Sequence, residues 1–345
     1  MTTAIPKSRA LFERQELNYR THYAELKQRT KAEGELLPGS PGSMGKKDGS
    51  GNAYWYRTYY SVPGKKVEDF VAKPDEVQKL AAMAQRMEFA EWMKRQVSTL
   101  RSVGFQVADK QTARVLIELH NRRLFEAGMV LVGTLAFTAH LNEWGAVAVA
   151  AQTQDIDLAR RAPLELGMPL SFIQTMSATG LPFVEVPGMP NGTPETSVKL
   201  PGVQGLTVDL LAPGEHIGRP IKVPELEFAA QQVPYFGFLL DQAVPAASLA
   251  GWQCIPVRVP QVGRFVLHKL YSSLHRAGFP EKAEKDRMQA MTLTAVVETE
   301  EPGLLQEAFD AAPAGLRKEL RRARALLLGR AGRYPEVAQA WKQIL

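Results

Sequence analysis

The chain has 345 residues, of which 45% are hydrophobic and 23% charged, and this length and composition suit a globular protein of two domains. The formal net charge of +6 is mild for this length, so the position of the charges matters more than their sum. Cys254 is the only cysteine, which excludes an internal disulfide framework and a multi-cysteine zinc site.

The sequence offers no membrane-spanning segment. The most apolar run, residues 146–151, is far shorter than the roughly 18 apolar residues that a spanning helix needs. The first 20 residues lack the apolar core and the small-residue cleavage site of a secretory signal. We therefore expect a soluble, cytoplasmic protein without a membrane partner.

The first part of the chain predicts a helix followed by short strands. Residues 10–32 have helical composition, and a Pro/Gly/Ser-rich tract follows at 37–43. Residues 43–71 alternate aromatic and β-branched residues with turn chemistry at Asp48-Gly-Ser-Gly and at Pro63-Gly. This pattern predicts a three-stranded meander.

Two helices are expected next. Between residues 74 and 100 the apolar positions step by three and four, which is the period of a helix face. A second helix is predicted over residues 110–127, where Gly128 is well placed to end it.

From residue 129 the pattern mixes strands and helices, which predicts an α/β or α+β sheet domain. A short buried strand at 129–132 leads through the Gly133-Thr134 turn into a helix at 135–141. The later expectations are a strand ending in 155–158, a helix over 164–176, strands at 183–186, 196–200 and 206–211, a helix at 226–231, strand-like pieces at 236–240 and 255–259, and helices to the end, the first with Pro260 in its first turn.

Three acids on predicted strands form the candidate chemical site. Asp155 and Asp157 lie two apart, so their side chains point to the same face of a strand. Paired carboxylates repel unless a cation lies between them, and magnesium favours such oxygen ligands. Asp209, in Thr207-Val-Asp-Leu, can supply a third oxygen if its strand is a neighbour. The alternative is a solvated strand end, although an unpaired mid-strand acid is costly to bury.

This order of motifs resembles the DNA polymerase beta-like nucleotidyltransferases, and in particular a bacterial branch of unknown substrate. The resemblance rests on Val132-Gly133-Thr134, Asp155-Ile156-Asp157 and Asp209, and covers about residues 110–290. It implies an α+β fold with a mixed sheet and flanking helices, preceded by the β-meander and helices and followed by a helical C-terminal region. The expected segments are 1–42 (helix and linker), 43–73 (meander), 74–127 (helical connector), 128–260 (catalytic core) and 261–345 (helical domain).

The resemblance also implies roles for the residues. Asp155 and Asp157 would hold both metal ions, and Asp209 would bind one ion and help deprotonate the attacking hydroxyl. Gly133 and Thr134 would form the turn that binds the triphosphate, in agreement with the phosphate affinity of helix N-termini. Lys269, expected near the start of a helix, would meet the triphosphate; the alternative is a solvated lysine. Lys285-Asp286 resembles a pair that supports the fold, and His268 is expected to be packed or solvent-facing, with contact to the nucleotide as the alternative.

The meander and the C-terminus carry candidate nucleic-acid contacts. Basic and aromatic residues alternate along 43–71, and such a surface suits phosphates and stacked bases. The candidates for contact are Lys46, Lys47, Tyr56, Arg57 and Tyr59. The alternative is a brace whose aromatic side chains pack on the helix at 75–100. The basic run at 317–324 predicts a solvated helix, with an RNA-facing helix as the alternative.

Two functions remain open at this point. The first is an enzyme that uses magnesium, or manganese in its place, to transfer a nucleoside monophosphate from an NTP such as ATP to an acceptor. The acceptor could be an RNA end, a protein side chain or a small molecule, because one transferase fold serves many acceptors. The second is a protein that binds nucleic acid or another partner on a catalytically inactive fold.

Overall fold

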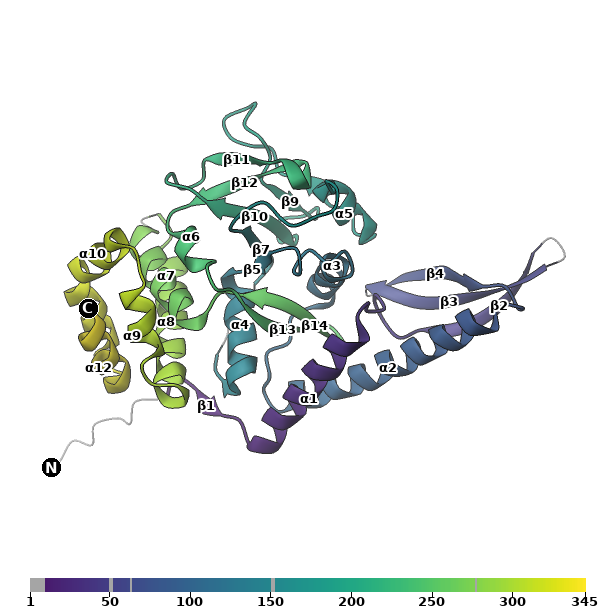
Figure 1. Cartoon of the computed structure of the whole chain (residues 1–345), viewed down its shortest axis with the longest axis horizontal. Coiled ribbons are helices and arrows are strands. Elements are labelled where there is room, and N and C mark those ends of the chain that lie inside the picture. Colours follow the sequence, from purple (N-terminus) through teal and green to yellow (C-terminus); the bar gives the residue numbers. More distant parts are fainter. Residues whose placement is uncertain (1–9, 50–51, 63, 150–152, 277) are drawn as a thin grey trace.

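The computed structural model describes residues 10–49, 52–62, 64–149, 153–276 and 278–345. The start of the chain, parts of the two predicted meander turns (residues 50–51 and 63) and part of the apolar run at 146–151 lie outside these ranges. Figure 1 shows an arm of two helices and a small sheet that extends to one side of a mixed core, with the C-terminal helices on the other side.

The arm contains the predicted meander. Strands β2 (Ser43–Gly49), β3 (Asn52–Val62) and β4 (Lys65–Ala72) form an antiparallel sheet in that order. The sheet lies along α2 (Val77–Ser102), and α1 (Leu17–Glu33) connects the arm to the core (Figure 1). The last turns of α2 bury one face, whose members are Ala90, Met93, Val97 and Leu100.

A seven-stranded mixed sheet forms the centre of the core, as the resemblance predicted. Its main path runs β11-β12-β10-β7-β5. Strand β9 pairs with β10 on the same edge as β12, and β8 pairs with β9. Strand β10 is parallel to β7 and β12, and the remaining pairs are antiparallel. The bounds are β5 Met129–Leu131, β7 Asp155–Arg160, β8 Val184–Glu185, β9 Ser197–Lys199, β10 Thr207–Pro213, β11 Pro220–Val223 and β12 Phe228–Val233.

Shorter elements complete the core. Helix α3 begins where the Asp109 carboxylate accepts hydrogen bonds from the backbone N–H groups of Gln111 and Thr112, an N-cap. The bounds are α3 Lys110–Asn121, α4 Gly133–Trp144, α5 Phe172–Ala178 and α6 Phe236–Leu239, with the pairs β13 Val244–Ala250 with β14 Gln253–Val259 and β1 Glu13–Arg14 with β6 Ala146–Val147.

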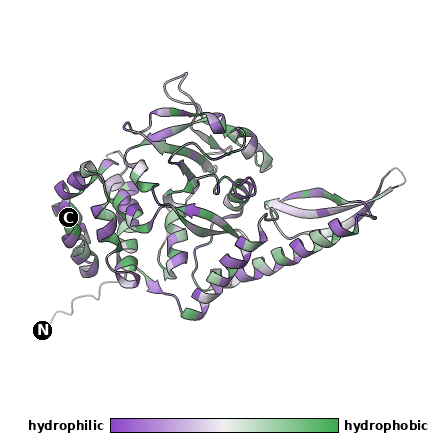
Figure 2. Ribbon diagram, in the orientation of Figure 1, coloured by the Kyte–Doolittle hydropathy of each residue, from purple (hydrophilic) through white to green (hydrophobic). Residues whose placement is uncertain are grey.

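The C-terminal helices pack on each other and on the core. Helix α7 (Val262–His275) makes its main contacts with α8 (Pro280–Glu300), and α9 (Leu304–Asp310), α10 (Ala314–Arg322), α11 (Arg324–Ala331) and α12 (Pro335–Ile344) follow. Trp341 is fully buried and donates a hydrogen bond from Nε1 to Thr294 Oγ1 at 3.0 Å, which fixes the last helix on α8. Figure 2 shows hydrophilic residues along these outer helices.

Several predicted elements were wrong in type or extent. The segment predicted as a helix at 226–231 is a short 3-10 turn, Pro224–Leu226, followed by strand β12, because Ala229 and Ala230 are buried in the sheet. The predicted strand at 236–240 is instead helix α6. The predicted helix over 164–176 is confined to α5, since Pro169 interrupts its first half.

Three boundaries also differ from the predictions. Strand β7 begins at Asp155 and continues to Arg160, whereas the predicted strand ended at residue 158. Helix α3 ends at Asn121, before the predicted residue 127. Pro260 precedes the Gln261 N-cap of α7 and is therefore outside the first turn. None of the helices in the described part of the chain is long and apolar enough to cross a membrane.

Candidate active site

The three acids lie on neighbouring strands at the centre of the sheet. In the parallel pairing of β7 and β10, Asp157 is opposite Asp209, and Asp155 is opposite Thr207. Residues opposite each other share a face of the sheet, and Asp155 is two residues from Asp157, so all three carboxylates belong to one face. We call these three residues the carboxylate edge. The sequence prediction that Asp209 lies on a strand next to β7 is confirmed.

Burial and mutual repulsion raise the pKa values of two of these acids. Asp157 is partly buried, and burial followed by the nearby charge of Asp209 raises its pKa to about 6. Burial also raises the pKa of Asp209, while a hydrogen bond donated by the Ser197 hydroxyl to its Oδ1 works in the opposite direction. Asp155 is exposed. The charge of Asp155 also acts to raise both pKa values, while Lys269 and Arg276 act to lower that of Asp157.

The Gly133 turn lies directly against this edge. Gly133 begins α4 with a φ of +64°, and a Cβ at this position would be 1.8 Å from Asp157 Oδ2. A hydrogen bond of 2.9 Å from the Val132 N–H to the Asp157 carbonyl holds the turn beside β7. The close approach leaves room for glycine alone, and it brings the N-terminus of a 12-residue helix to the carboxylate.

Thr134 lies in the first turn of the same helix, but its side chain is only 6% exposed. A buried hydroxyl is not available to a phosphate in the open site. The turn can offer its backbone N–H groups instead, and these are the groups that helix N-termini present to anions.

Lys269 has a different position from the one expected. It lies in the second half of α7, is buried, and donates a hydrogen bond from Nζ to Asp286 Oδ1 at 2.6 Å. Arg276 Nε binds the other oxygen of Asp286 at 2.6 Å. Burial alone would raise the pKa of Asp286, but Lys269 and Arg276 outweigh it and hold the pKa below its usual value. Asp286 thus supports the fold, and it is what holds the Lys269 ammonium.

Two lysines on α8 face the acids, and the sequence analysis did not assign them to the site. Burial lowers the pKa of Lys285, while the charges of Asp155 and Asp157 act to raise it, which places its ammonium within electrostatic reach of both. Lys282 similarly acts on Asp209. Their spacing of three residues on one helix, just before Asp286, is the sequence signal that could have indicated them.

The acids do not form a closed metal site as their side chains stand. Among the described residues, no group of three or more His, Cys, Asp and Glu side chains is arranged to hold a metal ion. Asp155, Asp157 and Asp209 share one face of the sheet but do not form such a group in this structure. Their role as metal ligands stays a prediction.

A family model described as nucleotidyltransferase matches residues 110–313, which is more than half of the chain. The chain belongs to this family. No curated protein and no solved structure matches it. The matched nucleotidyltransferase region begins at α3, includes the carboxylate edge, the Gly133 turn, Lys269 and Asp286, and ends just before α10. The arm and α10 lie outside it.

The surroundings of the nucleotidyltransferase core include one packed histidine. His268 is buried, and its Nε2 is 3.2 Å from the Pro234 carbonyl. Burial lowers its pKa to about 4, so the ring is neutral at physiological pH. The expectation of a packed rather than a nucleotide-binding histidine agrees with this position.

In the arm, two of the five candidate nucleic-acid contacts are corrected. Arg57 is 1% exposed, and its guanidinium donates hydrogen bonds to the carbonyl groups of Pro38, Ser40 and Pro41. Burial lowers its pKa to about 10. Tyr59 is 5% exposed, and its ring centre is 3.9 Å from the Arg57 guanidinium carbon. Neither side chain can contact nucleic acid at the surface.

The opposite face of the meander remains open. Tyr54 and Tyr56 alternate with the buried residues of β3, and both rings make edge contacts with Phe70, which is 54% exposed. Lys47 Nζ lies 5.6 Å from the centre of the Tyr56 ring and pairs with Glu68. We call Lys47, Tyr54, Tyr56 and Phe70 the outer aromatic face. Lys46 is also exposed, opposite Trp55, on the other side of the sheet.

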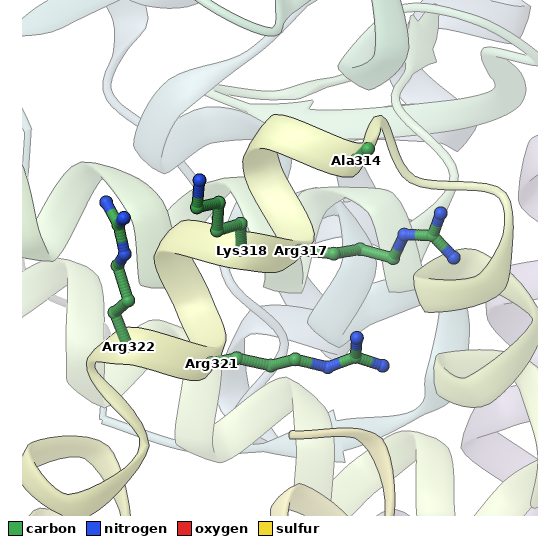
Figure 3. A pocket seen from close by; sticks show the side chains of 5 residues that line it. All are labelled: Ala314, Arg317, Lys318, Arg321 and Arg322. Carbon is green, nitrogen blue, oxygen red and sulfur yellow. The ribbon is translucent and has the colours of Figure 1, made fainter.

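A basic cavity lies away from the carboxylate edge, on α10 (Figure 3). It has a volume of about 490 Å³ and is lined by Ala314, Arg317, Lys318, Arg321 and Arg322. Figure 3 shows Arg317 and Arg321 extending side by side from the helix. We call the four basic residues the α10 cation patch. It is a second charged feature of the nucleotidyltransferase, separate from the matched region.

Proposed function

We propose that the protein transfers a nucleoside monophosphate from an NTP to an acceptor in a reaction that needs magnesium, or manganese in its place. The observation that carries this proposal is Asp157 opposite Asp209 on adjacent parallel strands, with the Gly133 helix start against Asp157. Membership of the nucleotidyltransferase family supports transfer of a nucleotidyl group in general. ATP is one candidate donor.

The carboxylate edge suits a divalent cation. It offers hard oxygen donors, and the pKa of Asp157, raised by burial and then by the charge of Asp209, is one that a cation bound at this place would lower. Asp155, Asp157 and Asp209 would hold the ion. When bound, the ion would neutralise charge on the triphosphate and on the attacking oxygen.

The remaining residues would bind and orient the nucleotide. The backbone N–H groups at the start of α4 would bind phosphate oxygens, and Lys282 and Lys285 would add positive charge from α8. Lys269 would act as a positioning residue, because its ammonium is bound to Asp286 and contributes to the site by its field.

The reaction would be an in-line displacement at the α-phosphorus. An acceptor oxygen would form a bond to this phosphorus while the bond to the bridging oxygen of the β-phosphate breaks, and pyrophosphate would leave with the bonding electrons. Asp209 would take the acceptor proton or pass it to water; the Ser197 hydroxyl, which donates to its Oδ1, would fix the orientation of the carboxylate.

We also propose that the acceptor is a nucleic acid that contacts the outer aromatic face. Exposed aromatic rings next to a lysine suit stacked bases and a neighbouring phosphate. Of the residues that the sequence indicated, Lys47 and Tyr56 lie on this face and remain accessible for this role, whereas Lys46 is exposed on the other side of the sheet.

One observation favours a second function, that of a binding protein without activity. The acids in the described residues do not group as a metal site in the unbound chain. A catalytically inactive fold would give this arrangement, whereas in an enzyme the side chains would close around the ion when nucleotide and metal bind.

A transfer assay separates the two functions. The protein is incubated with each α-³²P-labelled NTP, magnesium, and total cellular RNA or protein, and the labelled product is identified. We expect label on one acceptor with the wild-type chain and none with Asp157→Asn or Asp209→Asn. Asp75→Asn, which removes an exposed acid on the arm, is the matched control and should behave as wild type. Full transfer by Asp157→Asn would exclude the proposed site, and no label with any NTP would favour the binding protein.

A further inference from the structure

The α10 cation patch gathers four basic side chains within six residues of one helix. Arginine and lysine side chains elsewhere form many ion pairs, for example Arg160 with Glu225 and Arg122 with Glu118. Across the described ranges, none of Arg317, Lys318, Arg321 and Arg322 forms an ion pair. Arg317 has one long contact of 3.5 Å to the Asp310 carbonyl, and Arg321 lies 5.2 Å from the Phe309 ring centre.

The nearby acids are already engaged by other groups. Glu319, on α10 itself, accepts a hydrogen bond from the Tyr235 hydroxyl at 2.9 Å, and its other oxygen is 2.7 Å from His275 Nε2. The Asp310 carboxylate accepts a hydrogen bond from Gln306 at 2.9 Å. These contacts direct the negative charge away from the cavity. The four cations therefore repel each other around a cavity of about 490 Å³ without an internal counter-charge.

An anionic ligand with several charges would remove this repulsion. Arg317 and Arg321 are four residues apart, as are Lys318 and Arg322, so each pair is separated by about 6 Å along the helix. That spacing is comparable to the distance between successive phosphates of a nucleic-acid strand. Arginine also binds phosphate through two parallel N–H groups. Two parallel rows of cations suit a chain of phosphates better than a single small anion.

The patch is connected to the carboxylate edge through α7. Glu319 holds His275, the last residue of α7, and the next residue, Arg276, binds Asp286 together with Lys269. A strand bound on α10 would therefore lie on the same group of helices that borders the acids.

We infer that the α10 cation patch binds the sugar-phosphate backbone of a nucleic-acid strand, the acceptor of the proposed transfer. The identification of the bound strand as the acceptor rests on the proposed function, but the binding itself needs neither NTP nor metal. Helix α10 lies just outside the residues that match the family, so family membership alone does not imply the patch.

Fluorescence anisotropy with a short labelled single-stranded RNA, and with a DNA of the same sequence, tests the inference in the absence of NTP and magnesium. The double variant Arg317→Gln/Arg321→Gln should weaken binding at least about tenfold and reduce the slope of log K against log salt by roughly 1.4, since two phosphate contacts to a single strand are lost. Arg123→Gln/Arg161→Gln is the matched control, because it removes the same charge from exposed arginines elsewhere and should change neither quantity. Circular dichroism checks that both variants fold.

Two competitors distinguish other sources of phosphate. Inorganic triphosphate and vesicles containing phosphatidylserine are added at equal phosphate concentration. The inference holds if unlabelled strand competes far better than either. It is overturned if the double variant binds the strand as the wild type does, or if triphosphate or vesicles bind the patch in preference to the strand. Asp157→Asn should retain strand binding, so a failure of transfer and a failure of binding can be told apart.

Discussion

The carboxylate edge and the α10 cation patch each gather charges of one sign, but they differ in burial and in what surrounds them. Asp157 and Asp209 are partly buried in the sheet, and burial raises their pKa values. Three of the four α10 cations are exposed on an outer helix. Unpaired charge in a low-dielectric site changes the protonation of the group itself, whereas unpaired charge in water mainly attracts partners. We therefore assign chemistry to the first region and docking to the second.

Substitution of Gly133 should have the largest effect, because the Gly133 turn lies against the carboxylate edge and is separate from the α10 cation patch. In Gly133→Ala the new Cβ would collide with the Asp157 carboxylate at a positive φ, so we expect transfer to fall by roughly 100-fold or more, as when a positioned donor is lost. Gly192→Ala is the control for backbone strain, since it also has a positive φ but no atom within 4 Å. Transfer rates and strand binding are measured for both. The comparison fails if Gly133→Ala weakens strand binding as much as transfer.

The stability of Asp157→Asn should show that the acid is held at a cost. The rise of the Asp157 pKa from 3.8 to about 6 corresponds to about 3 kcal/mol. The wild-type penalty is full above pH 6 and disappears below about pH 4, where the acid is protonated in both the folded and the unfolded chain. Without metal, the variant should thus be more stable by up to about 3 kcal/mol at pH 7 and no more stable near pH 4. Urea unfolding at both pH values measures this, and a gain independent of pH would contradict it.

Lys269 and Lys285 are expected to have different roles: Lys269 should stabilise the fold, and Lys285 should bind the nucleotide. Lys285→Met should raise the KM for NTP roughly tenfold, the loss of one charge-assisted hydrogen bond, with little change in Tm. Lys269→Met should lower Tm, because it leaves the buried Asp286 carboxylate with Arg276 alone. Steady-state kinetics and thermal unfolding are compared for the two variants. An unchanged Tm in Lys269→Met would show that the lysine is available to the nucleotide.

Substitutions in the outer aromatic face should have the smallest effect. This surface extends the comparison to aromatic side chains, since its lysine, Lys47, is paired with Glu68. Tyr56→Ala should weaken RNA binding by about 1 kcal/mol if the ring stacks on a base. Tyr59→Phe, on the covered face of the same strand, should leave RNA affinity unchanged. Filter binding measures both variants. Equal affinities for Tyr56→Ala and wild type would leave the meander as a brace.

The sequence was sufficient for the local parts of the site. The two-residue spacing of Asp155 and Asp157, and the position of Asp209 in an apolar strand, indicated one face of a sheet, and the register of β7 and β10 agrees. It could not indicate that Asp286, on the next helix, would hold Lys269, because nothing local pairs residues 17 apart.

The arm shows a different limit. The period of two in β3 implied that Arg57 and Tyr59 share a face and that Tyr56 lies on the other. Which face is covered depends on the loop at residues 38–41 and on α2, which contact the strand in space but lie outside it in the sequence. Similarly, the basic run at 317–324 predicted a helix, but only the folded chain shows that its acid, Glu319, is held by Tyr235 and His275.

The way in which Arg57 holds the loop has a consequence for how this protein can vary among relatives. All three of its hydrogen-bond acceptors are main-chain oxygens, which every amino acid supplies. Residues at positions 38 and 41 can therefore change without loss of an acceptor, provided that the path of the backbone is kept, whereas the Ser40 hydroxyl also accepts a hydrogen bond from the Tyr60 N–H at 3.0 Å. Arg57 has no such freedom, since lysine has a single nitrogen and lacks the planar fork. In an alignment, the junction between loop and sheet should thus combine an invariant arginine with variable residues at positions 38 and 41.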